Sequence, residues 1–220
     1  MFTFKRWFVV FVLVMVALLV GNFALATETR AQDTQISALE FHNAMRKLWE
    51  DHITWTRLYI VSTAADLPDT DAVAGRLLQN QVDIGNAIRP FYGDEAADQL
   101  TALLQEHITG AVAVLDAAKA GDQAQVESAT EAWYVNGDEI AVFLSTANPD
   151  NWTEPHMKAE MKMHLDLTLQ EAVDHLGGNS AASIAGYDEV HEHILHMADM
   201  LSSGIMAQFP DQFSAATLPA

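Results

Sequence analysis

Apolar side chains recur at spacings of three and four residues along nearly the whole stretch from about residue 35 to residue 209. This period matches the turn of an α-helix, and no alternating, strand-like pattern competes with it. The clearest stripe consists of Phe41, Met45, Leu48, His52, Trp55 and Tyr59. The chain is therefore predicted to be all-α.

Short breaks divide this stretch into about six expected helices. The breaks are rich in Pro, Gly, Asn and Asp, which end or cap helices. They fall at residues 66–70, 89–93, 121–122, 148–151 and 177–180. Linkers this short favour antiparallel neighbours, so we predict one compact bundle. It would form a single domain over residues 35–209, followed by a tail over residues 210–220, and we find no clear internal repeat.

The first 26 residues have the layout of a secretory signal. Lys5 and Arg6 precede an apolar run from Trp7 to Val20, and Ala24-Leu25-Ala26 fits a cleavage site. The alternative is an uncleaved N-terminal anchor, since the segment is nearly long enough to span a bilayer. We favour cleavage, with a flexible segment over residues 27–34 and a periplasmic or secreted location. The alternative would anchor the protein to the outer face of the cytoplasmic membrane.

The chain is strongly acidic, with 30 Asp and Glu against 11 Lys and Arg and a net charge of −19. Lys5 and Arg6 are the only charged residues of the expected signal, so the chain without it would carry −21. This charge argues against nucleic acid and anionic membrane surfaces as partners and favours cations. The sequence has no Cys, which excludes disulfides, thiolate metal sites, iron–sulfur clusters and c-type haem attachment.

Polar residues take positions on the apolar stripes of all six expected helices. They are His52, His107, His164 and His191, together with Asn80 and Asn136. A single histidine of this kind is more often a hydrogen-bonded core residue, but four on separate helices point to a shared metal centre. His52 and His107 are interior in both helical phases that the pattern allows. His164 and His191 are interior in one phase and lie at the edge of the stripe in the other.

Carboxylates one helical turn from a histidine support this hypothesis. Asp188 and His191 have the i,i+3 spacing of the Glu-x-x-His pairs in ferritin-like sites, although two true pairs of that kind are absent. The predicted ligands are His52, His107, His164, His191, Asp188 and Glu171. Side chains expected to support these ligands are Asn80, Asp83, Asn136, Glu139, Arg57 and Arg89. Mixed imidazole and carboxylate ligands suit iron, zinc, manganese or copper.

Three alternatives stay open. Methionines and histidines of the last two expected helices suggest a copper or silver site, although Met is also a common core filler. They are Met157, Met161, Met163, His164, His191, His193, His196, Met197 and Met200. A metal-free helical sensor or interaction domain would satisfy its polar core internally, and b-type haem could lie between core His and Met. The reaction, the substrate and the oligomeric state are left open.

Four strings resemble those of a group of exported or membrane-anchored bacterial all-helical proteins that have no assigned activity. The strings are Leu48-Trp49-Glu50-Asp51-His52 with Trp55-Thr56-Arg57, Arg89-Pro90-Phe91-Tyr92-Gly93, Trp133-Tyr134-Val135-Asn136-Gly137-Asp138-Glu139-Ile140, and Gly204-Ile205 with Gln208-Phe209-Pro210. The resemblance covers most of residues 45–210. It implies an all-α fold and no particular function.

Overall fold

The computed structural model describes residues 35–214, so the expected signal peptide and the segment over residues 27–34 lie outside the described residues. Its helices are α2 (Ala38–Ala64), α3 (Thr70–Ala120), α4 (Gln123–Ala147), α5 (Glu154–Leu176) and α6 (Ser180–Gln208). The all-α prediction is confirmed. Within residues 35–214, none of the helices combines the length and the apolar character that crossing a bilayer requires.

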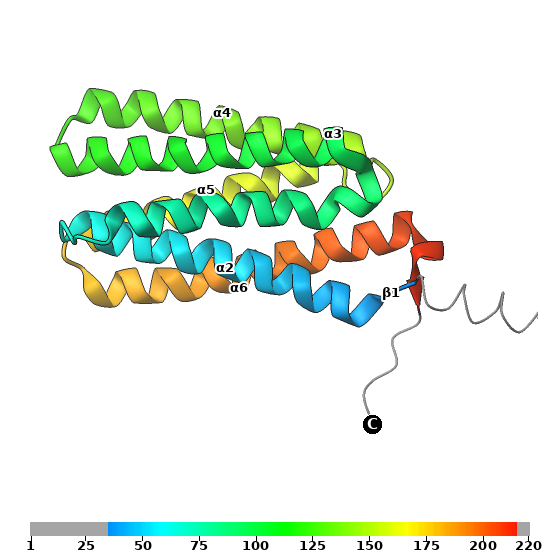
Figure 1. Cartoon of the computed structure of the whole chain (residues 1–220). Helices are drawn as coiled ribbons and strands as arrows, with labels where there is room; N and C mark the ends of the chain where they lie inside the picture. Colours follow the sequence, from blue (N-terminus) through cyan, green and yellow to red (C-terminus); the bar gives the residue numbers. More distant parts are fainter. Residues whose placement is uncertain (1–34, 215–220) are drawn as a thin grey trace, which may run out of the picture.

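The second and third expected helices form one kinked element, α3, so the described residues contain five α-helices where about six were expected. Helical conformation continues through Pro90 and is interrupted at Gly93, whose φ of 82° is easily adopted by glycine alone. The rings of Phe91 and Tyr92 pack against Phe209, with centroids 5.7 and 5.2 Å away, which holds this last turn in place. Figure 1 shows the two halves of α3 running in opposite directions.

The helices form a closed ring. α2 packs against α3 and α6, α4 packs against α3 and α5, and α5 packs against α6. Because the halves of α3 are antiparallel, the ring consists of three helical hairpins (Figure 1). They are α2 with the first half of α3, the second half of α3 with α4, and α5 with α6. The first helices of the three hairpins therefore run in the same direction.

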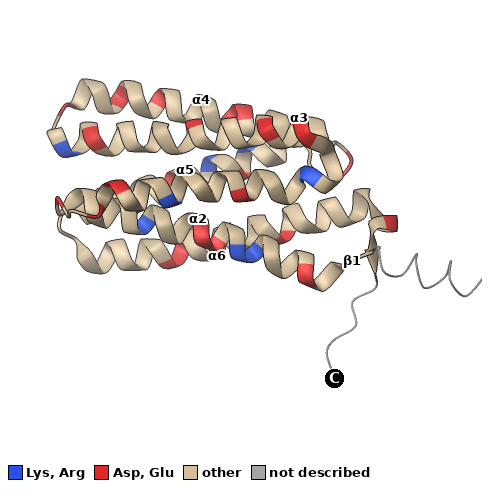
Figure 2. Ribbon diagram, viewed as in Figure 1, with Lys and Arg blue, Asp and Glu red and all other residues tan. Residues whose placement is uncertain are grey.

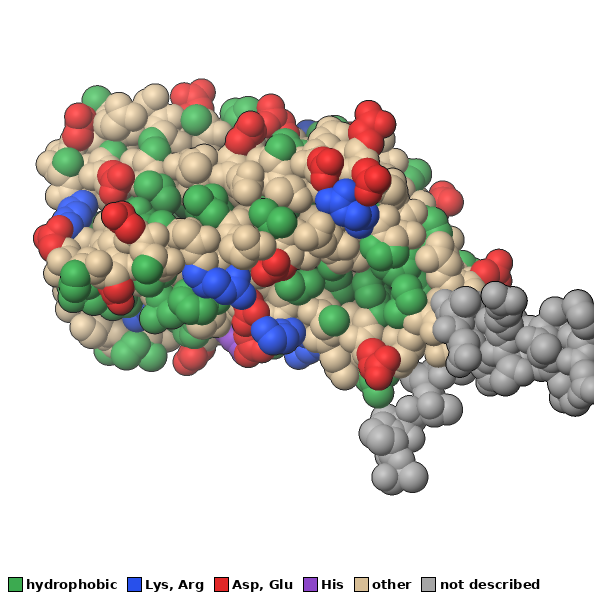
Figure 3. All heavy atoms as spheres, in the orientation of Figure 1, with side chains coloured by type: hydrophobic (Ala, Val, Ile, Leu, Met, Phe, Trp, Pro, Cys, Tyr) green, Lys and Arg blue, Asp and Glu red, His purple; other side chains and the backbone are tan. Residues whose placement is uncertain are grey.

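Buried apolar side chains fill the ring in two clusters. The larger cluster includes Met45, Ile84, Leu104, Ile140 and Met197, and the smaller one includes Tyr59, Leu77 and Leu115 near the turn from α2 to α3. Acidic residues are distributed over all the helices (Figure 2). Figure 3 shows their side chains spread over the surface, where histidine scarcely appears on the face in view. Four of the nine histidines, His52, His107, His164 and His193, are buried in the bundle.

The two ends of the described chain meet. β1 (Ile36–Ser37) pairs in parallel with β2 (Phe213–Ser214), which follows the short helix η1 (Pro210–Gln212). The ring of Phe213 lies 5.2 Å from that of Phe41 and 5.3 Å from that of Phe91. Residues 210–214, which the sequence predicts to be part of a tail, thus belong to the packed fold.

Gly85 lies where the two halves of α3 touch. A Cβ at this position would contact the Thr101 hydroxyl and stand 2.8 Å from the carbonyl oxygen of Ala97. Because a backbone oxygen cannot rotate away, we expect Gly85→Ala to lower the free energy of unfolding by about 1–3 kcal/mol, measured by urea denaturation. The matched control is Gly75→Ala, where nothing lies within 4 Å. Gly75→Ala should leave stability unchanged or raise it by up to ~1 kcal/mol. Equal losses in both variants would contradict the close approach of Gly85 to Ala97 and Thr101.

Candidate metal centre

Three of the four histidines predicted as ligands converge inside the ring. His52 comes from α2, His107 from the second half of α3 and His164 from α5, and each is at most 4% exposed. The ring centroids of His52 and His164 are 5.7 Å apart, those of His107 and His164 6.0 Å, and those of His52 and His107 6.4 Å. These near-equal distances define what we call the histidine triangle.

A hydrogen bond that repeats in all three hairpins fixes the helices around the triangle. In each hairpin, a side chain of the second helix donates to a backbone carbonyl of the first helix. The residue that bears this carbonyl lies four positions before the histidine of that first helix. The bonds run from Asn80 Nδ2 to the Leu48 oxygen (3.0 Å), from Asn136 Nδ2 to the Leu103 oxygen (3.1 Å) and from His193 Nε2 to the Glu160 oxygen (3.2 Å). The ring therefore has an approximate threefold repeat, with one histidine of the triangle in each unit.

Two of the three histidines have a hydrogen-bond partner at Nδ1. The Nδ1 atom of His107 is 3.1 Å from Asn136 Oδ1, and Nδ1 of His52 is 3.3 Å from the amide nitrogen of Gln81. Since the Asn136 amide nitrogen donates elsewhere, its oxygen must accept from His107 Nδ1–H, which leaves Nε2 of His107 with a lone pair. His164 faces the ring of His193 at 6.3 Å. Its Nδ1 is buried and has no hydrogen-bond partner among the described residues.

Burial keeps the triangle neutral. Desolvation lowers the pKa of His52 to about 3 and that of His107 to about 4, and it lowers the pKa of His164 well below its usual value. The neighbouring imidazoles lower the pKa of His52 and His164 further, since protonated rings would repel each other. All three rings are therefore unprotonated at neutral pH, which is the form that binds a metal ion.

A small cavity adjoins the triangle, and we call it the axial cavity. It measures about 30 Å³ and is lined by the three histidines, by apolar side chains and by the thioethers of Met45, Met161 and Met197. This is room for an ion or for two to three waters, each of which needs ~10–15 Å³. It lies an order of magnitude below the ~300 Å³ of a typical small-molecule pocket. The cavity therefore fits an ion far better than a haem.

The three histidine rings lie slightly farther apart than imidazoles that share one metal ion. Among residues 35–214, no three His, Asp or Glu side chains stand close enough to share an ion. Imidazoles bound to one ion through bonds of ~2.0–2.1 Å have their ring centroids roughly 5 Å apart. The rings of the triangle would have to approach each other by roughly 1 Å to hold such an ion.

The interior position expected for His191 is wrong. Its Nε2 lies 3.0 Å from Glu50 Oε1 and its side chain is about one-third exposed. The reason is the phase of α6, which turns Val190, Ile194, Met197, Ala198 and Leu201 inward. In this phase His193, 8% exposed, takes the interior position.

The two predicted carboxylate ligands also lie away from the triangle. Asp188 is exposed on α6. Glu171 is 1% exposed, but its Oε1 accepts from Arg57 Nη1 at 2.7 Å. Arg57 donates in addition to the hydroxyl of Ser183 at 2.5 Å. Arg57, which is partly exposed, and the buried Glu171 therefore form a separate ion pair between α2, α5 and α6.

The residues expected to support the ligands divide into two groups. Asn80 and Asn136 are buried and take part in the repeated hydrogen bonds described above. The other four bond or pair elsewhere or are exposed: Arg57 pairs with Glu171, Asp83 with Arg76, and Arg89 with Asp94 and Asp98, whereas Glu139 is exposed. Of the suggested copper cluster, Met157, Met161, His164, His193 and Met197 are buried, whereas Met163 and His196 are exposed.

Sequence reasoning missed Gln81, and it considered His193 only for the alternative copper or silver site and not for the core of the bundle. A regular interval could have found both, because Gln81 and Asn136 each follow the histidine of their hairpin by 29 residues. His193 follows His164 by the same interval. Compared with known proteins, the chain matches no family model, and neither a curated protein nor a solved structure resembles it at a significant level.

Proposed function

We propose that this protein is exported and binds one transition-metal ion through His52, His107 and His164. The observation that carries the proposal is the near-equilateral arrangement of three buried, neutral imidazoles beside a shared cavity. Asn136 would orient His107 through Nδ1 and leave Nε2 for the ion, as partners of metal-bound histidines commonly do. Because the triangle is shielded from solvent, the site suits storage, sensing or electron transfer better than hydrolysis.

The ligand set favours zinc or copper over manganese, since imidazole is a preferred ligand of the former and carboxylate of the latter. Copper(I) is the more specific candidate because thioethers of Met45, Met161 and Met197 line the same cavity as the imidazoles. A single positive charge is also less costly than a double one in an apolar core without a bonded carboxylate.

The test is metal analysis of the purified protein after incubation with zinc, iron(II), manganese or copper, the last in both oxidation states, followed by desalting. We expect one ion per chain, with zinc or copper retained best. His52→Leu combined with His107→Leu should abolish binding, because leucine fills the buried positions without offering a ligand. Circular dichroism will show that the helices of this variant persist.

The matched control is His191→Gln combined with His196→Gln, which removes two histidines outside the triangle and should keep the ion. A wild-type protein that binds none of these metals, or an ion that survives the His52→Leu, His107→Leu double substitution, would rule the proposal out. The double variant Met161→Leu, Met197→Leu distinguishes copper(I) from zinc as the bound ion. It should weaken copper(I) binding at least about tenfold and leave zinc binding unchanged.

A further inference from the structure

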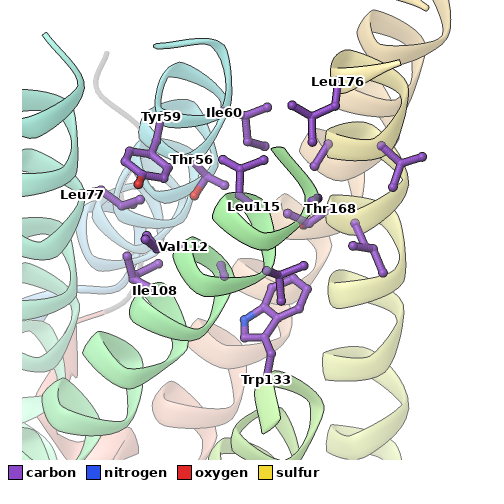
Figure 4. Close-up of a pocket in the computed structure, with 16 residues that line it drawn as sticks. Thr56, Tyr59, Ile60, Leu77, Ile108, Val112, Leu115, Trp133, Thr168 and Leu176 are labelled. Carbon is purple, nitrogen blue, oxygen red and sulfur yellow. The ribbon is translucent and has the colours of Figure 1, made fainter. Parts of the chain in front are cut away.

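The histidine triangle is buried, so an ion must cross the protein to reach it. One cavity that leads from this region toward the surface is a poor path for a cation. It measures about 60 Å³ and reaches the exposed Val173, and Figure 4 shows its side chains converging from α2, α3, α4 and α5. The hydroxyls of Thr56 and Thr168 donate to carbonyl oxygens of their own helices at 2.8 Å, and most other lining side chains are apolar. An ion would lose its hydration there without gaining ligands.

A different path consists of ligand-type side chains on α5 and α6. The ring of His164 faces that of His193 at 6.3 Å, which lies within the 5.7–6.4 Å spacing of the triangle itself. Beyond the buried His193 lie Glu160, whose side chain is 15% exposed, and His156, whose side chain is 48% exposed. Imidazole and carboxylate groups therefore continue from the triangle to the surface. We call His156, Glu160 and His193 the entry route.

The carboxylate of Glu160 faces an imidazole with each of its oxygens. Oε1 lies 3.7 Å from Nδ1 of His156, and Oε2 lies 3.9 Å from Nδ1 of His193. Both distances are too long for a hydrogen bond. Oε2 is buried and has no hydrogen-bond partner among residues 35–214. Because a buried carboxylate oxygen without a partner is costly, a cation bound to it would be stabilising.

The hydrogen bond of His193 leaves its Nδ1 able to bind that cation. Nε2 lies 3.2 Å from the backbone oxygen of Glu160, which can only accept, so Nε2 carries the proton. In the neutral ring Nδ1 then has a lone pair, and it faces Oε2 of Glu160 as a second acceptor. Two ligands with bonds of ~2.0–2.2 Å to one ion can stand up to roughly 4.3 Å apart. The separation of 3.9 Å therefore suits two ligands of one ion.

Binding along the entry route must be weak. Within residues 35–214, no three His, Asp or Glu side chains stand close enough to share an ion. Each step would therefore offer two protein ligands, one from each side of the Glu160 carboxylate. A path of this kind needs sites that are favourable enough to draw the ion in and weak enough to release it. Pairs of ligands meet that requirement better than a complete site.

We propose that His156, Glu160 and His193 form the route by which a transition-metal ion enters and leaves the triangle. His156 and Glu160 bind the ion at the surface, Glu160 and His193 bind it next, and His164 receives it into the triangle. The proposal rests on the proposed function of the triangle. It assigns a role to the unpartnered Oε2 of Glu160, which the triangle alone does not explain.

The test is the rate of loading. Metal-free full-length protein is mixed with zinc or with copper(I), excess chelator is added after timed intervals, and the retained ion is measured after desalting. We expect Glu160→Gln to slow loading roughly tenfold or more, because it removes the negative charge that draws the ion in. The final content should remain one ion per chain, since the three histidines of the triangle are intact.

His156→Gln separates a route from a ligand of the final site. It should slow loading and release by the same factor and leave the affinity unchanged, because it alters neither the net charge nor the triangle. Release is followed from the loaded protein in excess chelator. The matched controls come from the surface pair of Glu50 and His191, whose Oε1 and Nε2 atoms are 3.0 Å apart. Glu50→Gln and His191→Gln make the same chemical changes outside the entry route and should keep the wild-type rates.

Three results would overturn the route while leaving the metal centre intact. They are wild-type loading rates in Glu160→Gln and His156→Gln, equal slowing in the Glu50 and His191 variants, and a lower affinity of His156→Gln without slower loading. A wild-type protein that takes up neither zinc nor copper(I) would instead refute the metal centre, and the route with it.

Discussion

Acidification of the metal-free protein from neutral pH to about pH 4.5 should remove on the order of 5 kcal/mol of folding free energy through His52 and His107 alone. In the unfolded chain these imidazoles take up protons below their ordinary pKa of 6.5, whereas the folded pKa values are about 3 and about 4. Protons therefore favour the unfolded state as the pH falls from 6.5 toward 4. His164, whose pKa is also lowered, adds to the loss.

The measurement is urea denaturation at a series of pH values, compared with the variant His52→Leu, His107→Leu. The variant should lose much less stability over the same range, because it retains His164 alone of the triangle. His191→Gln removes a surface imidazole and should behave like the wild type. If the double variant and the wild type lose the same free energy on acidification, the histidines are not buried as neutral groups.

Replacement of Arg57 by Met should lower the free energy of unfolding at neutral pH by about 3–5 kcal/mol. Glu171 is 1% exposed and its carboxylate bonds to Arg57 at 2.7 Å, so the substitution leaves a buried charge without its cation. Arg57→Met combined with Glu171→Leu should recover most of the loss, since an apolar pair replaces the ion pair. A double variant as unstable as the single one would contradict the buried pair.

The loss of stability caused by Arg57→Met depends on pH with the opposite sign to the loss caused by the histidine triangle. Burial raises the pKa of Glu171, and Arg57 opposes this rise. Without Arg57 the folded pKa should climb further above the unfolded value. The Glu171 carboxyl of the folded variant then binds a proton more readily than that of the unfolded chain, so the loss of stability relative to the wild type becomes smaller as the pH falls toward 4.5. Arg46→Met provides the control, because the pair of Arg46 with Asp199 is partly exposed and should be worth less than ~1 kcal/mol.

The helices could be predicted closely because their signals are local. The breaks around Asp66, Gly121, Asn148 and Gly177 are where helices end in the structure, since a turn needs its special residues at that point of the chain. The break before Gly93 was less accurate, because the packing of Phe91 and Tyr92 against Phe209 depends on residues more than a hundred positions away. Tertiary contacts there extend the helix past Pro90.

The candidate site was predictable where the helical phase was unambiguous. His52 and His107 lie on their apolar stripes in either phase, and both are buried in the triangle. On α6 two phases fit the stripe, and the contacts of Val190 and Ile194 with neighbouring helices select the one that buries His193 in place of His191. The partner of Glu171 could not be predicted either, since Arg57 stands 114 residues away along the chain.

The sequence by itself determined the all-α class, the ends of most helices and the interior positions of His52, His107, Asn80 and Asn136, because periodicity and capping act over a few residues. Only the tertiary structure decided that His164 joins His52 and His107, that His193 replaces His191, and that three hairpins repeat one hydrogen bond around them. These features depend on the rotation and axial register of each helix against its neighbours. Register is set by the packing of the whole ring, which no single stripe specifies.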